Sequence, residues 1–155
     1  MLFVVNCLAL YRHSSFCQYY LYDTAAKTMT PLADGAKLRL ATWSPTSGKI
    51  AFVLNDNLFI ADLAAAAGTP PVQVTTDGEW NVVCNGVMDW AYEEEVASAT
   101  SALWWAPDGD TIAFLRFNQS EVPLFDFSFY TAPYNEDFSS VFIGNTSFAQ
   151  CDAEH

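Results

Sequence analysis

Three consecutive carboxylates, Glu93-Glu94-Glu95, are the residues best suited to chemistry in this chain of 155 residues. They follow Asp89, which can cap the start of a helix, and a helix dipole stabilises negative charge in the first turn. Successive helical residues point about 100° apart, so all three cannot share one face. Two of them can still converge on one point, where they could hold a compact cation such as an ammonium group.

The surroundings of the triplet leave two interpretations open. Trp90, Tyr92, Val96 and Trp104-Trp105 are close in sequence and could form an aromatic cavity beside the carboxylates. A free α-amino group has a pKa of about 7.7–8.0, and paired carboxylates favour its charged form. An acidic helix start is, however, usually just a solvated surface. The residues alone do not decide between an ammonium site and a solvated helix start.

The overall charge excludes one broad class of function. The chain has 6 Lys and Arg against 18 Asp and Glu, a formal net charge of -12. Nucleic-acid binding driven by phosphate neutralisation is therefore excluded, and docking on an anionic membrane is disfavoured. Hydrophobic residues make up 52% of the chain, which predicts a folded rather than disordered protein.

The apolar N-terminal residues 1–11 predict a strand rather than a membrane anchor. A span needs about 20 apolar residues, and a signal peptide would have a basic start and a cleavage site. The cysteines, at positions 7, 17, 84 and 151, show no C-x-x-C spacing, which disfavours a zinc site. No metal or cofactor is expected, and the cysteines do not define the redox compartment.

Elsewhere, short apolar runs alternate with turn residues, which is typical of an all-β protein. The four alanines within Asp62–Gly68 are expected to lie in a loop. The expected strands are Leu2–Leu10, Gln18–Tyr22, Arg39–Trp43, Lys49–Leu54, Asn57–Asp62, Val72–Thr75, Ala102–Trp105, Thr111–Phe117 and Pro123–Tyr130.

One hairpin pattern occurs twice. Trp43–Phe52 and Trp105–Phe114 share the Trp, the Pro and the Ile-Ala-Phe triplet, with an offset of 62 residues. Such a repeat is typical of a propeller, whose blades are about 40–50 residues, so an insertion is expected within residues 81–100. Two copies cannot close a ring of 4–8 blades. A chance duplication of a common hairpin is the alternative.

Several motifs resemble the N-terminal β-propeller of the dipeptidyl peptidase IV family. The most specific is Asp89-Trp-Ala-Tyr-Glu-Glu-Glu-Val96, and the likeness extends from about Tyr11 to Tyr130. The other matching segments are Tyr11-Arg-His-Ser14, Tyr20-Leu-Tyr-Asp23, Ala41-Thr-Trp-Ser-Pro45, Ile50–Phe59, Ser101–Gly109, Phe117–Leu124 and Phe127-Ser-Phe-Tyr130.

The resemblance implies a fold and a domain arrangement. Family members are serine exopeptidases that release N-terminal dipeptides, with an eight-bladed propeller and a C-terminal α/β-hydrolase domain. This chain is then expected to be an all-β partial propeller of about two to three blades, with a short helical insertion that carries the glutamates. Residues 1–131 would be the propeller fragment, and residues 132–155 a divergent tail, truncated or mis-spliced.

The resemblance also implies binding residues. Glu94 and Glu95 would hold the α-ammonium of a peptide substrate, Arg12 would bind its peptide carbonyl, and Glu93 would have a structural role. Taken alone, Arg12 would more commonly be a surface residue beside a strand. Ala97 stands where the family often has an aromatic side chain, so the pocket on the amine side is expected to differ in shape.

No catalytic residue is expected in this chain. It has no G-x-S-x-G motif, and neither His13 nor His155 is placed to act as a triad base. The chain alone should be inactive, with peptide N-termini and the α/β-hydrolase domain as partners, no nucleic acid, and the homodimers frequent in the family. Alternatives are a non-enzymatic interaction propeller of the same family and an incomplete product without a stable fold.

Two N-x-S/T triplets, at Asn118 and Asn145, are candidate glycosylation sites. Family members of this kind are usually secreted or anchored as type II membrane proteins. The resemblance thus implies the secretory pathway, with any anchor placed before Met1.

Overall fold

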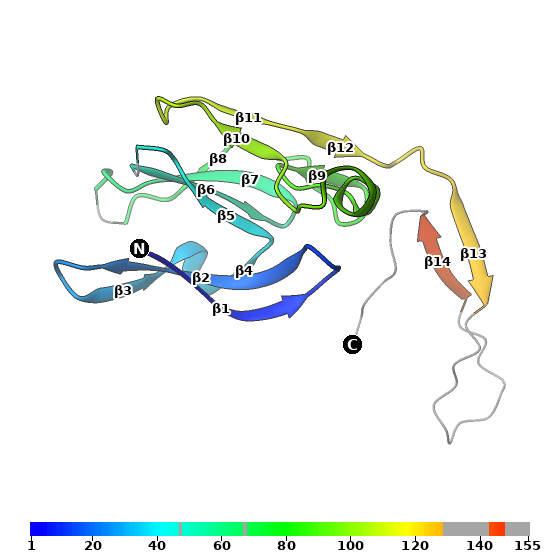
Figure 1. The fold of residues 1–155 in the computed structure, drawn as a ribbon, viewed down its shortest axis with the longest axis horizontal. Coiled ribbons are helices and arrows are strands. Elements are labelled where there is room, and N and C mark those ends of the chain that lie inside the picture. Colours follow the sequence, from blue (N-terminus) through cyan, green and yellow to red (C-terminus); the bar gives the residue numbers. More distant parts are fainter. Residues whose placement is uncertain (47, 67, 129–142, 148–155) are drawn as a thin grey trace, which may run out of the picture.

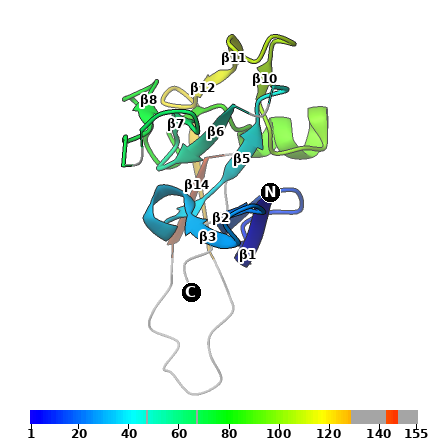
Figure 2. The same cartoon turned by 90° about the vertical axis from the view of Figure 1, so that its left-hand side faces the viewer.

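The structure, a computed structural model, describes residues 1–46, 48–66, 68–128 and 143–147, which form mainly short antiparallel strands. Three layers of sheet stack on one another, with β1–β4 lowest, β5–β8 in the middle and β10–β12 above (Figure 1). The view turned by 90° shows the same order (Figure 2). The all-β prediction is confirmed.

The strands pair within five sheets. The orders are β1-β2-β3 with β4 also on β2, β5-β6-β7-β8, β10-β11, β12-β9 and β13-β14. The elements are β1 (Leu2–Ala9), β2 (Ser15–Asp23), β3 (Thr28–Pro31), the 3₁₀ turn η1 (Leu32–Gly35), β4 (Lys37–Leu38), β5 (Leu40–Trp43), β6 (Lys49–Leu54), β7 (Asn57–Asp62), β8 (Val72–Gln73), β9 (Val83–Asn85), the π-helical η2 (Tyr92–Ala97), β10 (Leu103–Trp105), β11 (Ile112–Phe114), β12 (Arg116–Asn118), β13 (Leu124–Ser128) and β14 (Ile143–Ser147).

A tight turn sets the register of the middle sheet. Leu54 pairs with Asn57, so only Asn55 and Asp56 connect β6 to β7. Both turn residues have positive φ, 49° and 56°, as a type I′ hairpin turn requires. Asn and Asp tolerate this conformation better than other non-glycine residues, which explains their presence here.

Strand β6 is buried on both faces because a sheet packs on either side of it. Ile50 and Phe52 belong to a core cluster shared with the lower sheet, and Ala51 and Val53 belong to one shared with the upper sheet. Phe52 also stacks on Phe59 of β7, with ring centroids 5.3 Å apart.

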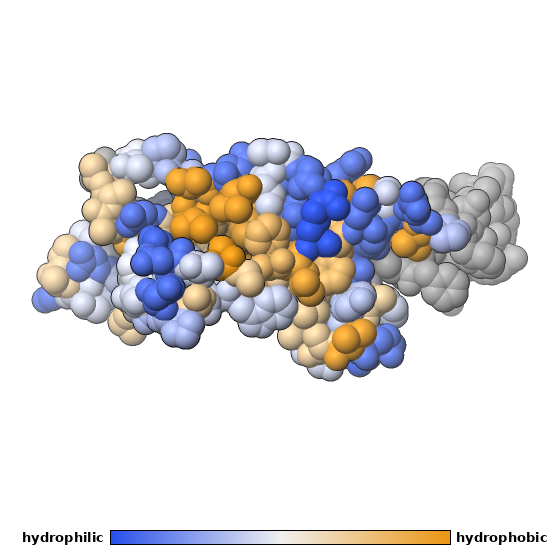
Figure 3. Space-filling model, turned by 90° about the horizontal axis from the view of Figure 1, so that it is seen from above, coloured by the Kyte–Doolittle hydropathy of each residue, from blue (hydrophilic) through white to orange (hydrophobic). Residues whose placement is uncertain are grey.

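The second copy of the repeat is buried on one face only. Ile112 and Phe114 pack against the upper cluster, whereas Ala113 and its cross-strand partner Trp104 are exposed. Trp104 is 52% exposed and Leu115 is 43% exposed. Seen from above, the molecule has open apolar surface flanked by hydrophilic residues (Figure 3).

Several predicted strands need correction. Residues 111–117 were expected to form one strand, but the segment breaks at Leu115, because β11 pairs with β10 while β12 pairs with β9. Residues 81–100, where an insertion is expected, include the short strand β9 as well as η2. Strands β3, β4 and β9 were not predicted. The strand predicted from Arg39 begins at Leu40. Asp62 ends β7, and residues 63–66 and 68 form turns and loop as predicted.

Most of the predicted tail, residues 132–155, lies outside the described residues. Its described part, β14, pairs with β13, and this hairpin extends beside the stacked sheets in Figure 1. Within the described residues, no helix is long and apolar enough to cross a bilayer.

Candidate functional site

Arg12, His13 and Ser14 lie in the turn between β1 and β2. Backbone hydrogen bonds from the N–H groups of Leu10 and Tyr11 to the carbonyl of Ser14, at 3.0 and 3.3 Å, close this turn. The turn is therefore held in a defined shape at its base.

A disulfide between Cys7 and Cys17 joins the same two strands. It encloses the residues that carry Arg12, so it ties the turn to the sheet. Sequence reasoning missed this pair. The available signal was that the two cysteines flank a turn, which brings them opposite each other once β1 and β2 pair.

The three glutamates lie on η2, and Asp89 caps the start of the helical residues 90–91 that lead into it. The Asp89 side chain accepts a 2.8 Å hydrogen bond from the backbone N–H of Tyr92, and its carbonyl accepts one of 2.9 Å from Glu93. This is the cap expected from the sequence. Ser98 ends the segment in the left-handed conformation, with φ of 51°.

The β1–β2 turn docks on η2 through Glu93. Its Oε1 accepts hydrogen bonds from the backbone N–H of His13 and from the hydroxyl of Ser14, both 3.0 Å. Thr100 donates a 2.7 Å bond to the carbonyl of His13. Glu93 itself is fully buried.

This docking brings Arg12 to Glu94. The guanidinium lies 3.4 Å from the carboxylate, and the side chains are 76% and 9% exposed, respectively. So exposed an arginine can exchange its carboxylate for another partner at little cost. Glu95 is exposed, and within the described part of the chain it makes no ion pair. The three glutamates thus range from fully buried to exposed, so they point in different directions around η2.

The aromatic residues near the triplet point in different directions. The ring of Tyr92 lies 4.9 Å from that of Phe117, and Trp105 packs against the upper core cluster. Trp104, the next residue on β10, faces the other side of its strand and is exposed. The two tryptophans therefore do not line one common cavity, contrary to the idea that both could surround the carboxylates.

A buried ion pair lies elsewhere in the middle layer. Arg39 and Asp56 are 2.6 Å apart with side chains 3% exposed, and Arg39 also donates to the carbonyl of Met88 at 3.3 Å. Its guanidinium lies 5.9 Å from the centre of the Trp80 ring. Burial raises the pKa of the neighbouring Cys84 thiol to about 11, so this cysteine stays protonated at neutral pH.

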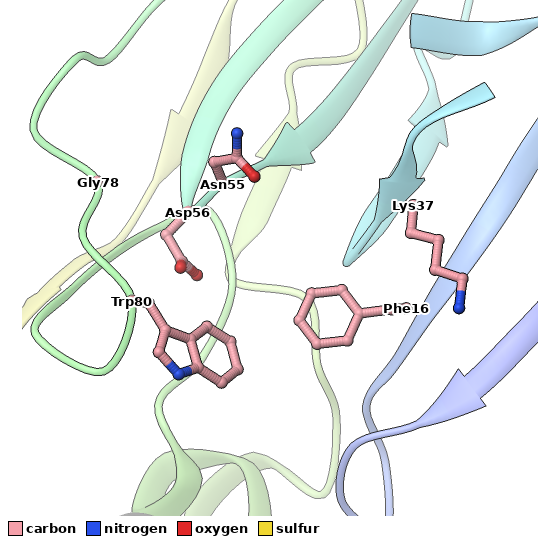
Figure 4. Close-up of a pocket in the computed structure, with 6 residues that line it drawn as sticks. All are labelled: Phe16, Lys37, Asn55, Asp56, Gly78 and Trp80. Atoms are coloured by element: carbon pink, nitrogen blue, oxygen red, sulfur yellow. The ribbon is translucent and has the colours of Figure 1, made fainter. Parts of the chain in front are cut away.

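Asp56 of this ion pair also lines an open pocket of about 390 Å³. The rings of Phe16 and Trp80 lie next to each other at the pocket, and Asp56 lies near Trp80 (Figure 4). The two rings are 5.7 Å apart. None of the residues predicted to bind substrate lines this pocket, whose lining is Phe16, Lys37, Asn55, Asp56, Gly78 and Trp80.

The remaining predicted sites are the two glycosylation candidates. Asn118 is exposed on β12, and its side chain accepts a 3.0 Å bond from the backbone N–H of Ser120. Asn145 lies on β14. Across the described residues, no group of three or more His, Cys, Asp or Glu side chains is arranged to hold a metal ion.

Comparison with known proteins decides the family. The model of the dipeptidyl peptidase IV N-terminal region matches residues 1–140. The chain belongs to this family. It is 39% identical to dipeptidyl peptidase 4 of Sus scrofa over 132 residues, which is 84% of this chain and 17% of the relative. It is 43% identical to "Probable dipeptidyl-aminopeptidase B" of Chaetomium globosum over 123 residues, 77% of this chain and 13% of the relative.

A solved structure of the dipeptidyl peptidase IV family has the same fold. Dipeptidyl peptidase 4 of Porphyromonas gingivalis matches with a TM-score of 0.77 and 32% identity, over 96% of this chain and 20% of that protein. The family predicted from the motifs is therefore confirmed. The chain spans less than a fifth of the length of the curated relatives named above.

Proposed function

We propose that this chain is the substrate-recognising part of a dipeptidyl peptidase. Glu94 and Glu95 bind the α-ammonium of a peptide, and Arg12 binds its first peptide carbonyl. The observation that carries the proposal is the 3.4 Å contact between Arg12 and Glu94, which joins two segments far apart in sequence.

The chemistry of these groups suits a peptide N-terminus. Paired carboxylates favour the charged form of an amino group, and the fixed distance from them to Arg12 measures the length of the first residue. A peptide held at both points would present the bond after its second residue at a constant position. Binding at both points therefore restricts the reaction to the release of dipeptides from the peptide N-terminus.

The nucleophile comes, in this proposal, from a C-terminal α/β-hydrolase domain, because acyl transfer needs an activated serine or cysteine. The exposed face of β10 and β11 supports the view that this chain is two to three blades of a longer propeller with the glutamates on a helical insertion. In the first copy of the repeat, the equivalent face is covered by another sheet. Residues 1–131 would be the propeller part.

We also propose a secretory location, secreted or anchored in the membrane, with Asn118 and Asn145 glycosylated and with a homodimeric full-length protein. The Cys7–Cys17 disulfide supports it, because such bonds persist in oxidising compartments.

Calorimetric titration of the 155-residue chain with alanyl-proline amide tests the function. The free peptide should bind at least about tenfold more tightly than its N-acetylated form, which lacks the ammonium group. Equal affinity for the two peptides would contradict recognition of the amino terminus. Binding that survives loss of the ammonium would instead favour a general interaction surface.

A further inference from the structure

We propose that Glu93 is a positioning residue that fixes the distance between the ammonium-binding carboxylates and Arg12. This inference rests on the proposed function. It goes further, because the distance that selects the first residue of the peptide is then set by Glu93, a buried group that touches no substrate.

Glu93 and Glu94 hold the same turn in two ways. Glu93 binds the backbone N–H of His13 and the Ser14 hydroxyl, while Glu94 meets the guanidinium of Arg12. The two glutamates are consecutive on η2. The backbone of the turn and the side chain of Arg12 are therefore both held by the same rigid segment. The position of Arg12 relative to Glu94 then depends on the bonds to Glu93.

Arg12 has little else to hold it. Its side chain is 76% exposed, and a free arginine loses substantial conformational entropy when it is fixed. The bonds made by residues 13 and 14 fix the backbone next to Arg12. This removes part of the entropy cost of ordering Arg12 before a peptide binds. Thr100, which follows η2, holds the carbonyl of His13 and completes the clamp.

The burial of Glu93 is difficult to explain by stability alone. It is 0% exposed, and its Oε2 has no hydrogen-bond partner among the described residues. A buried carboxylate with an unsatisfied oxygen normally destabilises a fold. Glu93 compensates for this cost with two strong, charge-assisted hydrogen bonds to the β1–β2 turn.

The test separates the carbonyl contact from the ammonium contact with two probes. Alanyl-proline amide offers an ammonium and a carbonyl, and isobutylamine offers only an ammonium. Binding of both to the 155-residue chain is measured by NMR titration, for the native chain and for Glu93→Ala, Glu93→Gln, Ser14→Ala and Arg12→Ala. Glu121→Ala, an exposed glutamate far along the chain, is the matched control.

Glu93→Ala should weaken binding of the peptide amide about tenfold and should change binding of isobutylamine by no more than about twofold. Glu93→Gln keeps an oxygen acceptor and should restore most of the affinity. Combining Glu93→Ala with Arg12→Ala should add little to Arg12→Ala alone, because both remove the same contact. Amide hydrogen exchange at His13 should accelerate in Glu93→Ala without any ligand.

Equal weakening of both probes would show a merely structural role and overturn the inference, and so would unchanged peptide binding in Glu93→Ala. If Glu93→Ala does not fold, Ser14→Ala, which removes one of the two bonds to Glu93, carries the same comparison, with Glu93→Gln as the conservative control. Failure of the native chain to distinguish the peptide amide from its acetylated form would instead reject the proposed function. In that case, unchanged amide hydrogen exchange at His13 in Glu93→Ala would still show that Glu93 does not hold the β1–β2 turn.

Discussion

The backbone N–H of His13 lies 3.0 Å from the buried Oε1 of Glu93, 80 residues further along the chain. Together with the bond from the Ser14 hydroxyl to the same oxygen, this bond joins the turn that carries Arg12 to the helical segment that carries Glu94. The turn carries one of the three proposed peptide-binding groups, and the helical segment carries the other two. Their junction is therefore the feature on which function should depend, and features around it should control stability.

Removal of the Cys7–Cys17 disulfide should lower stability. The bond closes a sequence separation of 10 residues, for which loop entropy predicts a loss of about 2.5 kcal/mol. Urea unfolding of the Cys7→Ser, Cys17→Ser double variant measures this loss. Dithiothreitol should destabilise the native chain and not the double variant, and an unchanged midpoint in both cases would contradict the prediction.

Loss of one partner from the Arg39–Asp56 pair should be severe. Asp56→Ala leaves the guanidinium buried without its carboxylate, which costs about 3–5 kcal/mol. The exposed pair Lys49–Asp110 has a similar distance, 2.7 Å, and provides the control. Asp110→Ala should not shift the urea midpoint measurably, whereas similar midpoints for the two variants would show that burial does not matter here.

Gly78 should not tolerate a side chain. A Cβ there would lie 2.5 Å from the backbone carbonyl carbon and oxygen of Asp56, so Gly78→Ala should cost about 1–3 kcal/mol. Gly48, where a Cβ would meet nothing within 4 Å, is the matched control. Thermal unfolding of the two variants should differ clearly, and equal melting temperatures would count against the close packing at this turn.

Cys84 should make stability fall at high pH. Its pKa is raised from 9.0 to about 11 in the folded chain, so the unfolded chain releases this proton first. The contribution is complete below pH 9 and is lost between pH 9 and about 11. The stability difference between native and Cys84→Ala chains, from urea unfolding at pH 8 and pH 10, should shrink at the higher pH. A constant difference would contradict the raised pKa.

The sequence predicted some elements well and others poorly, for physical reasons. The turn at Asn55-Asp56 combines residues that accept positive φ with apolar runs on both sides, so the β6–β7 hairpin was visible. Strands β4 and β9 have two and three residues, too few for a periodic pattern. The break at Leu115 was hidden, because a change of strand partner leaves no local signal in an apolar run.

The candidate site was predictable to a similar degree. The triplet and Arg12 were found from their motifs, but the order of burial from Glu93 to Glu95 depends on which side of η2 the β1–β2 turn docks. The Arg39–Asp56 pair was missed, because its partners are 17 residues apart, one between β4 and β5 and the other in the β6–β7 turn. Long-range pairing of this kind is not encoded in spacing.

The central claim is that Glu94 and Glu95 together bind an amino terminus. The most direct measurement combines Glu94→Gln and Glu95→Gln with alanyl-proline amide and its N-acetylated form in four calorimetric titrations of the 155-residue chain. The double variant should lose the preference for the free amino group, at least about tenfold in affinity, and should bind the acetylated peptide as the native chain does. A preference that persists in the double variant would contradict the claim.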